Sequence, residues 1–186
     1  MFGTPENNHK SFPLTTIGRI VETVNYGTSK PASNDGKFKY LRMNNISYEG
    51  QLDLSDCKTI TLDPEIDADC FVKKGDLLFN RTNTKELVGK TCVYNLDYPM
   101  VIAGYIIKVK LQKGYLSEYV SGYLNSEYGK GLLRKMAKGA VHQANINAQE
   151  LKSIRVLDVP YDLQLKYLRL LQQVDKSGFV SSNRGL

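Results

Sequence analysis

Three polar segments of this chain combine amides, hydroxyls and cations, the side-chain types that bind nucleic acids. Arginine, asparagine and lysine can hydrogen-bond base edges or phosphates, and none of them is a nucleophile or a general base at neutral pH. The segments therefore predict a DNA-binding surface, and the alternative is a set of solvated loops. The predicted contacts are Tyr26, Thr28, Ser29, Lys30, Arg81, Thr82, Asn83, Thr84, Lys85, Lys135, Lys138, His142, Gln143, Asn145 and Asn147.

The three segments suit different parts of a duplex. In residues 81–85 the cation and amide side chains fit base edges in the major groove. In residues 138–147 glutamine and asparagine can bond adenine in both directions, and the surrounding basic residues suit phosphates. Asn145 and Asn147 could equally cap the turn that follows them. Residues 26–31 offer hydroxyls and a lysine for phosphates, or they form a plain surface turn.

Motifs for catalysis are scarce. The sequence has no glycine-rich loop for a nucleotide, no Gly-x-Ser-x-Gly elbow and no cysteine–histidine pair at useful spacing. Glu150-Leu151-Lys152 has the Glu-x-Lys form that some metal-dependent nucleases place on a strand. Such sites need a second carboxylate near the metal ion, and residues 98–149 contain no aspartate. We predict no catalytic residue and keep a nuclease as the less favoured alternative.

The charge of the chain is segregated along its length. The net charge is +6, which favours an anionic partner. Residues 49–76 hold eight acidic and three basic residues, a net charge of −5, so the rest of the chain carries +11. Because acidic surfaces seldom touch DNA, we expect this acidic stretch to lie apart from the contacts, facing solvent or a partner subunit.

Cysteine usage and hydropathy indicate a cytoplasmic protein. Cys57, Cys70 and Cys92 are odd in number and form no Cys-x-x-Cys pair, which argues against a metal site and against a disulfide framework. We expect reduced thiols. The polar N-terminus lacks the pattern of a signal peptide, and the longest apolar stretch, residues 100–107, is too short to cross a bilayer.

Periodicity predicts an α+β fold: a twisted, mainly antiparallel sheet with flanking helices, followed by a protruding coiled-coil-type helix. Helical spacing occurs at 15–24, 65–71 (one turn), 117–138 (two helices with a kink) and 148–152, and strands are expected at 37–46, 56–62, 77–79, 90–94, 101–111 and 153–159. We divide the chain into a DNA-binding domain at 1–159, a helix at 160–177 and a tail at 178–186.

The final helix has a regular apolar seam. Leu163, Tyr167, Leu170 and Val174 are spaced four, three and four residues apart, the pattern of a coiled coil. Asp162 can cap the start of this helix, and Ser177-Gly178 interrupts the seam. A monomer would expose the seam, so we predict that the chain forms an antiparallel homodimer through it.

Several motifs together resemble the target-recognition domain of the specificity subunit of type I restriction–modification enzymes. Residues 75–91, which contain Gly-Asp-Leu-Leu-Phe-Asn-Arg-Thr-Asn-Thr, are the main one. Residues 40–46 resemble the early strand of that domain, residues 138–147 its late loop, and residues 151–177 the exit into the long helix of the family. Residues 1–5 resemble the junction by which that helix leads into a second recognition domain.

This resemblance implies sequence-specific recognition of one half of a bipartite DNA target. In the family the specificity subunit has no active site; it recruits methyltransferase subunits, which carry S-adenosylmethionine and methylate an adenine, and a restriction subunit, which cleaves. The final helix would pack against the methyltransferase subunit and a counterpart helix. The shortness of that helix would fit a half subunit or a truncated cassette. A stand-alone DNA-binding regulator is the alternative of a different class.

Overall fold

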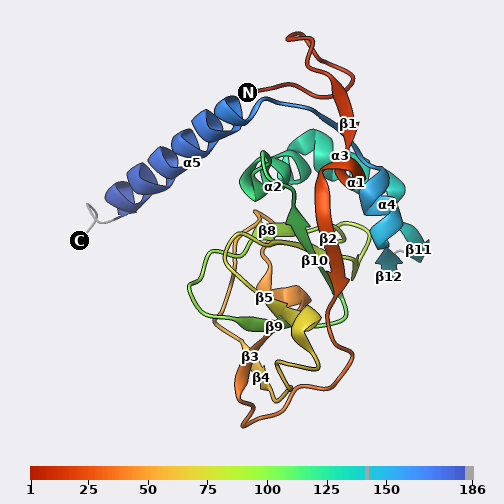
Figure 1. The fold of residues 1–186 in the computed structure, drawn as a ribbon, viewed down its shortest axis with the longest axis vertical. Coiled ribbons are helices and arrows are strands. Elements are labelled where there is room, and N and C mark those ends of the chain that lie inside the picture. The colour runs from red at the N-terminus through yellow and green to blue at the C-terminus, as the bar shows by residue number, and fades with distance from the viewer. Residues whose placement is uncertain (141–142, 183–186) are drawn as a thin grey trace.

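The computed structural model describes residues 1–140 and 143–182. The chain folds into a body of sheets and short helices, from which one long helix extends (Figure 1). The helices are α1 (Ile17–Ile20), α2 (Ser117–Asn125), α3 (Glu127–Met136), α4 (Ala148–Ser153) and α5 (Tyr161–Ser182), with single 3-10 turns η1 (Met43–Asn45) and η2 (Ala68–Cys70). The strands are β1 (Leu14–Thr16), β2 (Val21–Tyr26), β3 (Phe38–Leu41), β4 (Lys58–Ile60), β5 (Phe71–Val72), β6 (Leu77–Asn80), β7 (Thr82–Asn83), β8 (Thr91–Val93), β9 (Met100–Ile102), β10 (Ile106–Leu111), β11 (Lys138–Ala140), β12 (Gln143–Asn145) and β13 (Arg155–Leu157).

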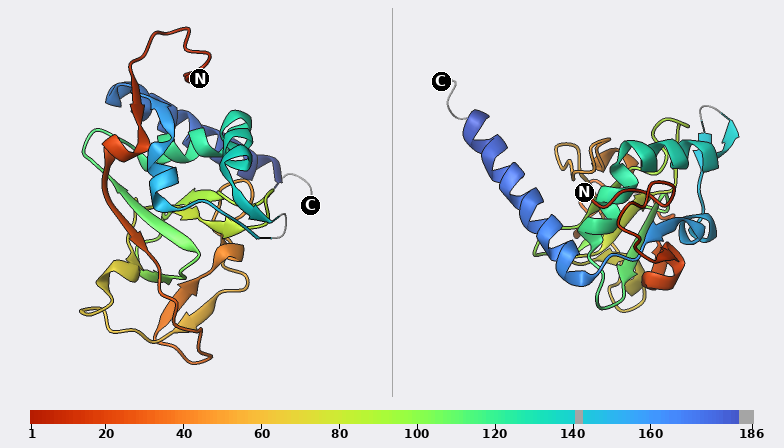
Figure 2. Two further views of the ribbon diagram at one scale, coloured as in Figure 1. Left: turned by 90° about the vertical axis from the view of Figure 1, so that its right-hand side faces the viewer. Right: turned by 90° about the horizontal axis from the view of Figure 1, so that it is seen from above.

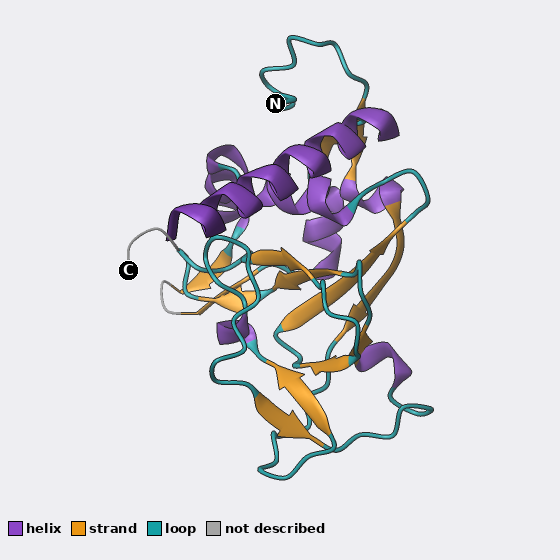
Figure 3. Ribbon diagram, turned by 90° about the vertical axis from the view of Figure 1, so that its left-hand side faces the viewer, coloured by secondary structure: helices purple, strands orange, loops and turns teal. Residues whose placement is uncertain are grey.

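An antiparallel sheet with the strand order β2-β10-β6-β8 forms the centre of the body. Successive side chains of a strand point to opposite faces, so β6 serves two cores. Leu77 and Phe79 pack with apolar residues of α1, α2, α3 and α4, whereas Leu78 packs with residues of a second sheet, β4-β3-β9-β5. Figure 3 shows the α-helices gathered on one side of the central strands, whereas short helical turns lie beside the lower strands. The predicted α+β class is confirmed.

Three expected elements differ in the structure. The strand expected at 37–46 ends at Leu41, the last residue of β3, because Met43–Asn45 form the 3-10 turn η1. The helix expected at 15–24 is limited to α1, because the chain turns extended at Val21 and β2 pairs with β10 along its length. The strand expected at 101–111 is divided into β9 and β10, which belong to different sheets, by a turn in which the Ile106 amide donates to Ala103. The pairing with β10 outweighs the local helical spacing of residues 17–24.

The expected pair of helices with a kink is confirmed as α2 and α3. Ser126 separates them, and its hydroxyl accepts a hydrogen bond from the Gly129 amide as the N-cap of α3. The edge strand expected near residue 155 is confirmed as β13, which pairs with β1.

Helix α5 is anchored to the body at its beginning. The Gln164 side chain is fully buried, accepts a hydrogen bond from the Leu116 amide and donates to the carbonyls of Gly114 and Val159. The Tyr167 ring contacts the Phe2 ring edge to face, 5.9 Å between centroids. Beyond these contacts the helix extends away from the body, as the view from above shows (Figure 2).

These anchors correct the interpretation of the apolar seam. Leu163 and Tyr167 pack against the chain's own core, so the first half of the seam is not exposed. Leu170 and Val174 are 49% and 66% exposed. Asp162 is not the cap, because the helix begins at Tyr161 and Asp162 lies in its first turn. The helix also continues to Ser182, past Ser177-Gly178, where the sequence predicted its end.

Candidate nucleic-acid interface

Two of the predicted contact segments form one small sheet. Strand β7 pairs antiparallel with β12, which places Thr82 opposite Asn145. The Thr82 hydroxyl donates to the Asn145 side-chain oxygen over 2.9 Å, and the Ile146 amide donates to the Arg81 carbonyl over 2.9 Å. Strand β11 completes the sheet by pairing with β12, so the described part of residues 138–147, expected as a loop, contains two antiparallel strands, called the hairpin below.

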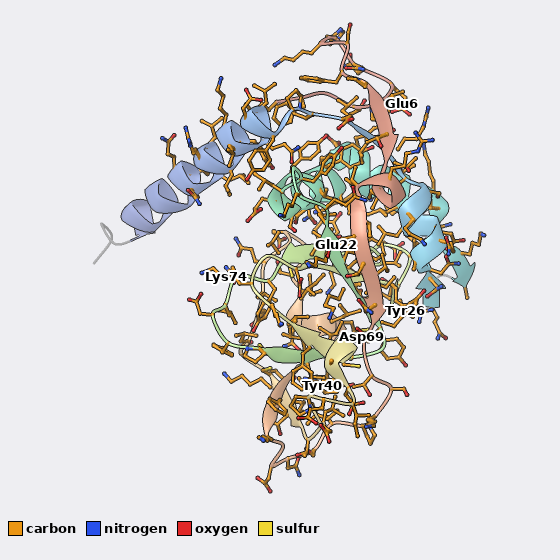
Figure 4. The ribbon with its side chains drawn as sticks, in the orientation of Figure 1. Glu6, Glu22, Tyr26, Tyr40, Asp69 and Lys74 are labelled. Carbon is orange, nitrogen blue, oxygen red and sulfur yellow. The ribbon has the colours of Figure 1, made fainter. Side chains whose placement is uncertain are left out.

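The third segment joins this sheet through Tyr26 at the end of β2. The Arg81 guanidinium carbon lies 5.0 Å from the centroid of the Tyr26 ring, a cation–π contact. The Tyr26 hydroxyl accepts a hydrogen bond from the Ala148 amide, just after the hairpin. Figure 4 shows Tyr26 on the side of the body that carries β11 and β12. All three segments therefore meet on one side of the molecule, although they are far apart in sequence.

Arg81 is placed with unused hydrogen-bonding capacity. Its Nε is shielded from solvent and has no hydrogen-bond acceptor among the described residues. One terminal nitrogen donates to the Gly104 carbonyl over a long 3.5 Å. A guanidinium presents five N–H groups in a planar fork, which suits the O6 and N7 acceptors of a guanine or two oxygens of one phosphate.

Sequence reasoning missed Asn80, which holds this region together. Its side chain is fully buried and donates to the carbonyls of Thr82 and Tyr105, each over 3.1 Å, while its oxygen accepts from the Asn83 side-chain nitrogen Nδ2 over 2.9 Å. The available signal was an amide at the end of an apolar strand, because a buried polar group must find partners. Asn80 joins the turn between β9 and β10 to the segment that follows β6.

Several predicted contacts have side chains already bonded within the protein. The Thr28 side chain is buried, and its oxygen accepts from the Lys30 amide. The Asn83 oxygen accepts from the Thr84 amide. Asn147 is the N-cap of α4: its oxygen accepts from the Glu150 amide, and a Glu150 oxygen accepts from the Asn147 amide. The capping alternative for Asn147 is thus confirmed. The side chains of Thr28, Asn83 and Asn147 form hydrogen bonds with the backbone of their own segments.

The other predicted contacts lie at the surface. Gln143 is exposed on the hairpin, and Ser29 is exposed beside Lys30. Lys85 and Lys135 are exposed and form no ion pair with any described side chain. His142 lies outside the described residues. Exposed amide, hydroxyl and cation side chains are therefore available among the predicted contacts.

Two lysines of the predicted contacts are already paired with carboxylates. Lys138 Nζ lies 2.6 Å from a Glu150 oxygen, and Lys30 Nζ lies 3.1 Å from an Asp67 oxygen. The hydrogen bond from Lys138, followed by that from the Asn147 amide, lowers the pKa of Glu150 below its usual value. The expectation that the acidic stretch lies apart from the contacts is wrong for Asp67, because the turn that carries it packs beside the segment after β2.

The geometry does not favour the nuclease alternative. Glu150 lies on helix α4 instead of a strand, and its two oxygens bind the Asn147 amide and Lys138. Within residues 1–140 and 143–182, no group of three histidine, cysteine, aspartate or glutamate side chains could hold a metal ion. Cys92 is buried, and its pKa is raised to about 12 by that burial. No described helix is long and apolar enough to span a membrane.

Comparisons with known proteins give a consistent result. The chain is 27% identical over 103 residues to a protein of Methanocaldococcus jannaschii (strain ATCC 43067) assigned as the type I restriction enzyme MjaX specificity subunit. That match covers 54% of this chain and 24% of the relative. No protein-family model matches the chain.

Two solved structures share the fold. The HsdS subunit of Thermoanaerobacter tengcongensis matches with a TM-score of 0.67 over 98% of this chain and 43% of its own length. A chain from a study of complex assembly and conformational transition of the type I restriction–modification system matches with a TM-score of 0.60, over 91% and 42%. Both are 15% identical to this chain, which spans less than half the length of each relative.

Proposed function

We propose that this chain, which resembles a type I specificity subunit in sequence and in fold, recognises one half of a bipartite DNA target in the cytoplasm. The observation that carries the proposal is the pairing of β7 with β12 beside Arg81 and Tyr26, which gathers the three polar segments into one surface. A β-ribbon fits the major groove of B-DNA. The hairpin of β11 and β12 is such a ribbon, and every residue of β11 is exposed.

Each group has a separate role in this proposal. Gln143 on the hairpin reads an adenine through its amide, and Arg81 reads a guanine or clamps a phosphate with its free N–H groups. The exposed lysines Lys85 and Lys135 contact phosphates, which positions the domain without selecting a sequence. Stacking on Tyr26 fixes the direction in which Arg81 points, so fewer side-chain conformations are lost on binding.

The chemistry belongs to partner subunits in this proposal. Methyltransferase subunits hold S-adenosylmethionine and methylate the target, and a restriction subunit cleaves DNA. This chain contributes no catalytic group and selects where the partners act. We further propose that two copies associate through the distal half of α5, where Leu170 is exposed, so that two recognition surfaces reach the two halves of the target.

The test is a competition assay of the chain with its methyltransferase subunits against a randomised duplex library. Gln143→Ala should weaken binding to the preferred target by about 1–3 kcal/mol and relax the preference at one position. Lys135→Ala should weaken all sequences about equally and make the salt slope shallower by about one. Gln51→Ala, which removes an exposed amide near α5, is the matched control.

Two results would count against the proposal. If Gln143→Ala and Arg81→Ala both keep the preferred sequence and its affinity, the surface does not read DNA. If the chain binds DNA but never co-purifies with a methyltransferase subunit, it is a stand-alone regulator.

A further inference from the structure

Each of two lysines in the proposed interface is held by a carboxylate that the protein fixes in place. Lys30 Nζ lies 3.1 and 3.3 Å from the two oxygens of Asp67. The Asp67 side chain is 17% exposed and the Lys30 side chain 58%. Asp67 closes a turn in which its amide donates to the Asp63 carbonyl over 2.8 Å and its carboxylate accepts from the Asp63 amide. The carboxylate therefore belongs to a shaped turn, and the lysine reaches toward it.

The second pair repeats this arrangement on a different element. Lys138 Nζ lies 2.6 Å from Glu150, whose side chain is 18% exposed against 80% for the lysine. The capping box with Asn147 fixes the Glu150 carboxylate at the start of α4. In both pairs the lysine comes from a segment proposed to contact DNA, and the acid comes from a helical turn beside that segment. The lowered pKa of Glu150 agrees with a carboxylate that stays ionised beside its lysine.

These ion pairs contribute little to the free energy of folding. They have a larger effect on the surface charge that a bound DNA duplex would contact. Exposed pairs stabilise proteins by about 0.2–1 kcal/mol, because solvent screens them and holding long side chains costs entropy. A lysine that is paired with a carboxylate gives up part of its attraction for a phosphate. A phosphate that replaces the carboxylate as its partner must also lie beside that negative charge.

We propose that Asp67 and Glu150 are specificity-determining residues, which weaken binding to non-target DNA by holding Lys30 and Lys138. The proposal rests on the function proposed above. Binding to an arbitrary sequence depends on phosphate contacts alone. Each carboxylate therefore lowers the affinity for that sequence by the contribution of the lysine that it holds. On the target, base contacts from the hairpin and Arg81 set a docked position in which both lysines stay on their carboxylates, so freeing the lysines strengthens non-target binding more than target binding. The unpaired Lys85 and Lys135 provide the remaining attraction on any sequence.

Amide variants test this with little change in shape. Asp67→Asn and Glu150→Gln each remove one negative charge, and glutamine can still take the Glu150 position in a capping box. We expect each variant, assembled with its methyltransferase subunits, to bind an unrelated duplex about two- to five-fold more tightly, the factor that corresponds to an exposed ion pair. The slope of log affinity against log salt should steepen by about 0.9 for each freed lysine. The ratio of target to non-target affinity should fall.

Two controls separate this role from general charge repulsion. Glu65→Gln removes an exposed carboxylate two residues from Asp67 that holds no lysine, so it should change non-target affinity less. In the double variant Lys30→Gln with Asp67→Asn the gain should disappear, because no lysine is freed. Unfolding midpoints of all variants should match that of the unmodified chain.

The outcomes are distinguishable from a failure of the proposed function. If the unmodified complex binds its target but Asp67→Asn and Glu65→Gln give equal gains, or the gain survives in the double variant, the inference is overturned. If Asp67→Asn and Glu150→Gln leave non-target affinity unchanged, it is overturned as well. If no variant and no unmodified complex binds DNA, the proposed function itself fails.

Discussion

Replacing Asn80 should loosen the part of the candidate interface that carries Arg81 and β7, because this one buried side chain joins β6 and β7 to the turn between β9 and β10. Asn80→Ala removes two donated hydrogen bonds, to Thr82 and Tyr105, and one accepted from Asn83. The Tyr105 carbonyl keeps a second donor, the Arg81 amide at 2.9 Å. The Thr82 carbonyl loses the hydrogen bond from the Asn80 side-chain nitrogen. The Asn83 side-chain nitrogen loses the Asn80 oxygen as its acceptor.

The magnitude follows from these bonds. A hydrogen bond contributes about 1 kcal/mol net, and a buried group left without a partner costs about 1–3 kcal/mol. Three lost bonds, one of them partly compensated at Tyr105, should lower the free energy of unfolding by about 2–4 kcal/mol. Asn80→Asp should cost more, because a carboxylate would replace the amide that faces two carbonyl oxygens.

Urea unfolding of these variants measures the effect, with Asn83→Ala as the matched control. Asn83→Ala removes the bond that the Asn83 side-chain nitrogen donates to the buried Asn80 oxygen but leaves both bonds donated by Asn80 in place, so the loss should be smaller, about 1–2 kcal/mol. Equal slopes against urea would show that the variants unfold the same structure. A loss for Asn80→Ala no larger than that for Asn83→Ala would refute the reasoning, because Asn80 would then not join β6 and β7 to the turn between β9 and β10.

Three further predictions concern the rest of the chain. Leu170→Glu should leave the unfolding midpoint unchanged and abolish self-association in light scattering; an unmodified chain that stays monomeric at high concentration would contradict it. Phe2→Ala should cost about 3 kcal/mol, because the ring is buried against Phe12, Tyr119 and Tyr167. Cys92 should resist thiol reagents at pH 8 in the folded protein, and rapid labelling would contradict its burial. Because its folded pKa, about 12, lies above that of an unfolded thiol, its stabilising contribution should be present below about pH 8.5 and be lost as pH rises toward 12.

Local patterns predicted much of the fold. Strand β6 follows from the apolar run at 77–79. The glycines within the helical period predicted a break between two helices, although the break falls at Ser126 and the glycines lie inside α2 and α3. The edge strand at 155–157 was visible as well. In each case the residues that decide the structure are neighbours in sequence. The helix predicted from local spacing was wrong at residues 21–24, which form part of strand β2 because they pair with β10.

The candidate site was predictable in composition but not in arrangement. The three polar segments were recognisable because amides, hydroxyls and cations gather in each. That Tyr26 stacks on Arg81, or that Asp67 pairs with Lys30, depends on contacts across tens of residues, which a single sequence does not contain. The prediction made from the α5 seam failed for the same reason. The spacing identifies an apolar face of the helix, whereas the ring that contacts Tyr167 is the chain's own Phe2.

Strands β1 and β13 pair with each other, so the two chain connections of the body lie side by side. Leu14 lies opposite Leu157, so the chain begins and leaves the body on neighbouring strands, about 5 Å apart. The second core lies wholly between these two positions, whereas Phe2 and Val159 add to the first core from outside them. The body could therefore be inserted into a surface loop of another protein through two adjacent chain connections, provided that the segments carrying Phe2 and Val159 are kept with it. A host loop whose ends are about one strand spacing apart would accept it without distortion.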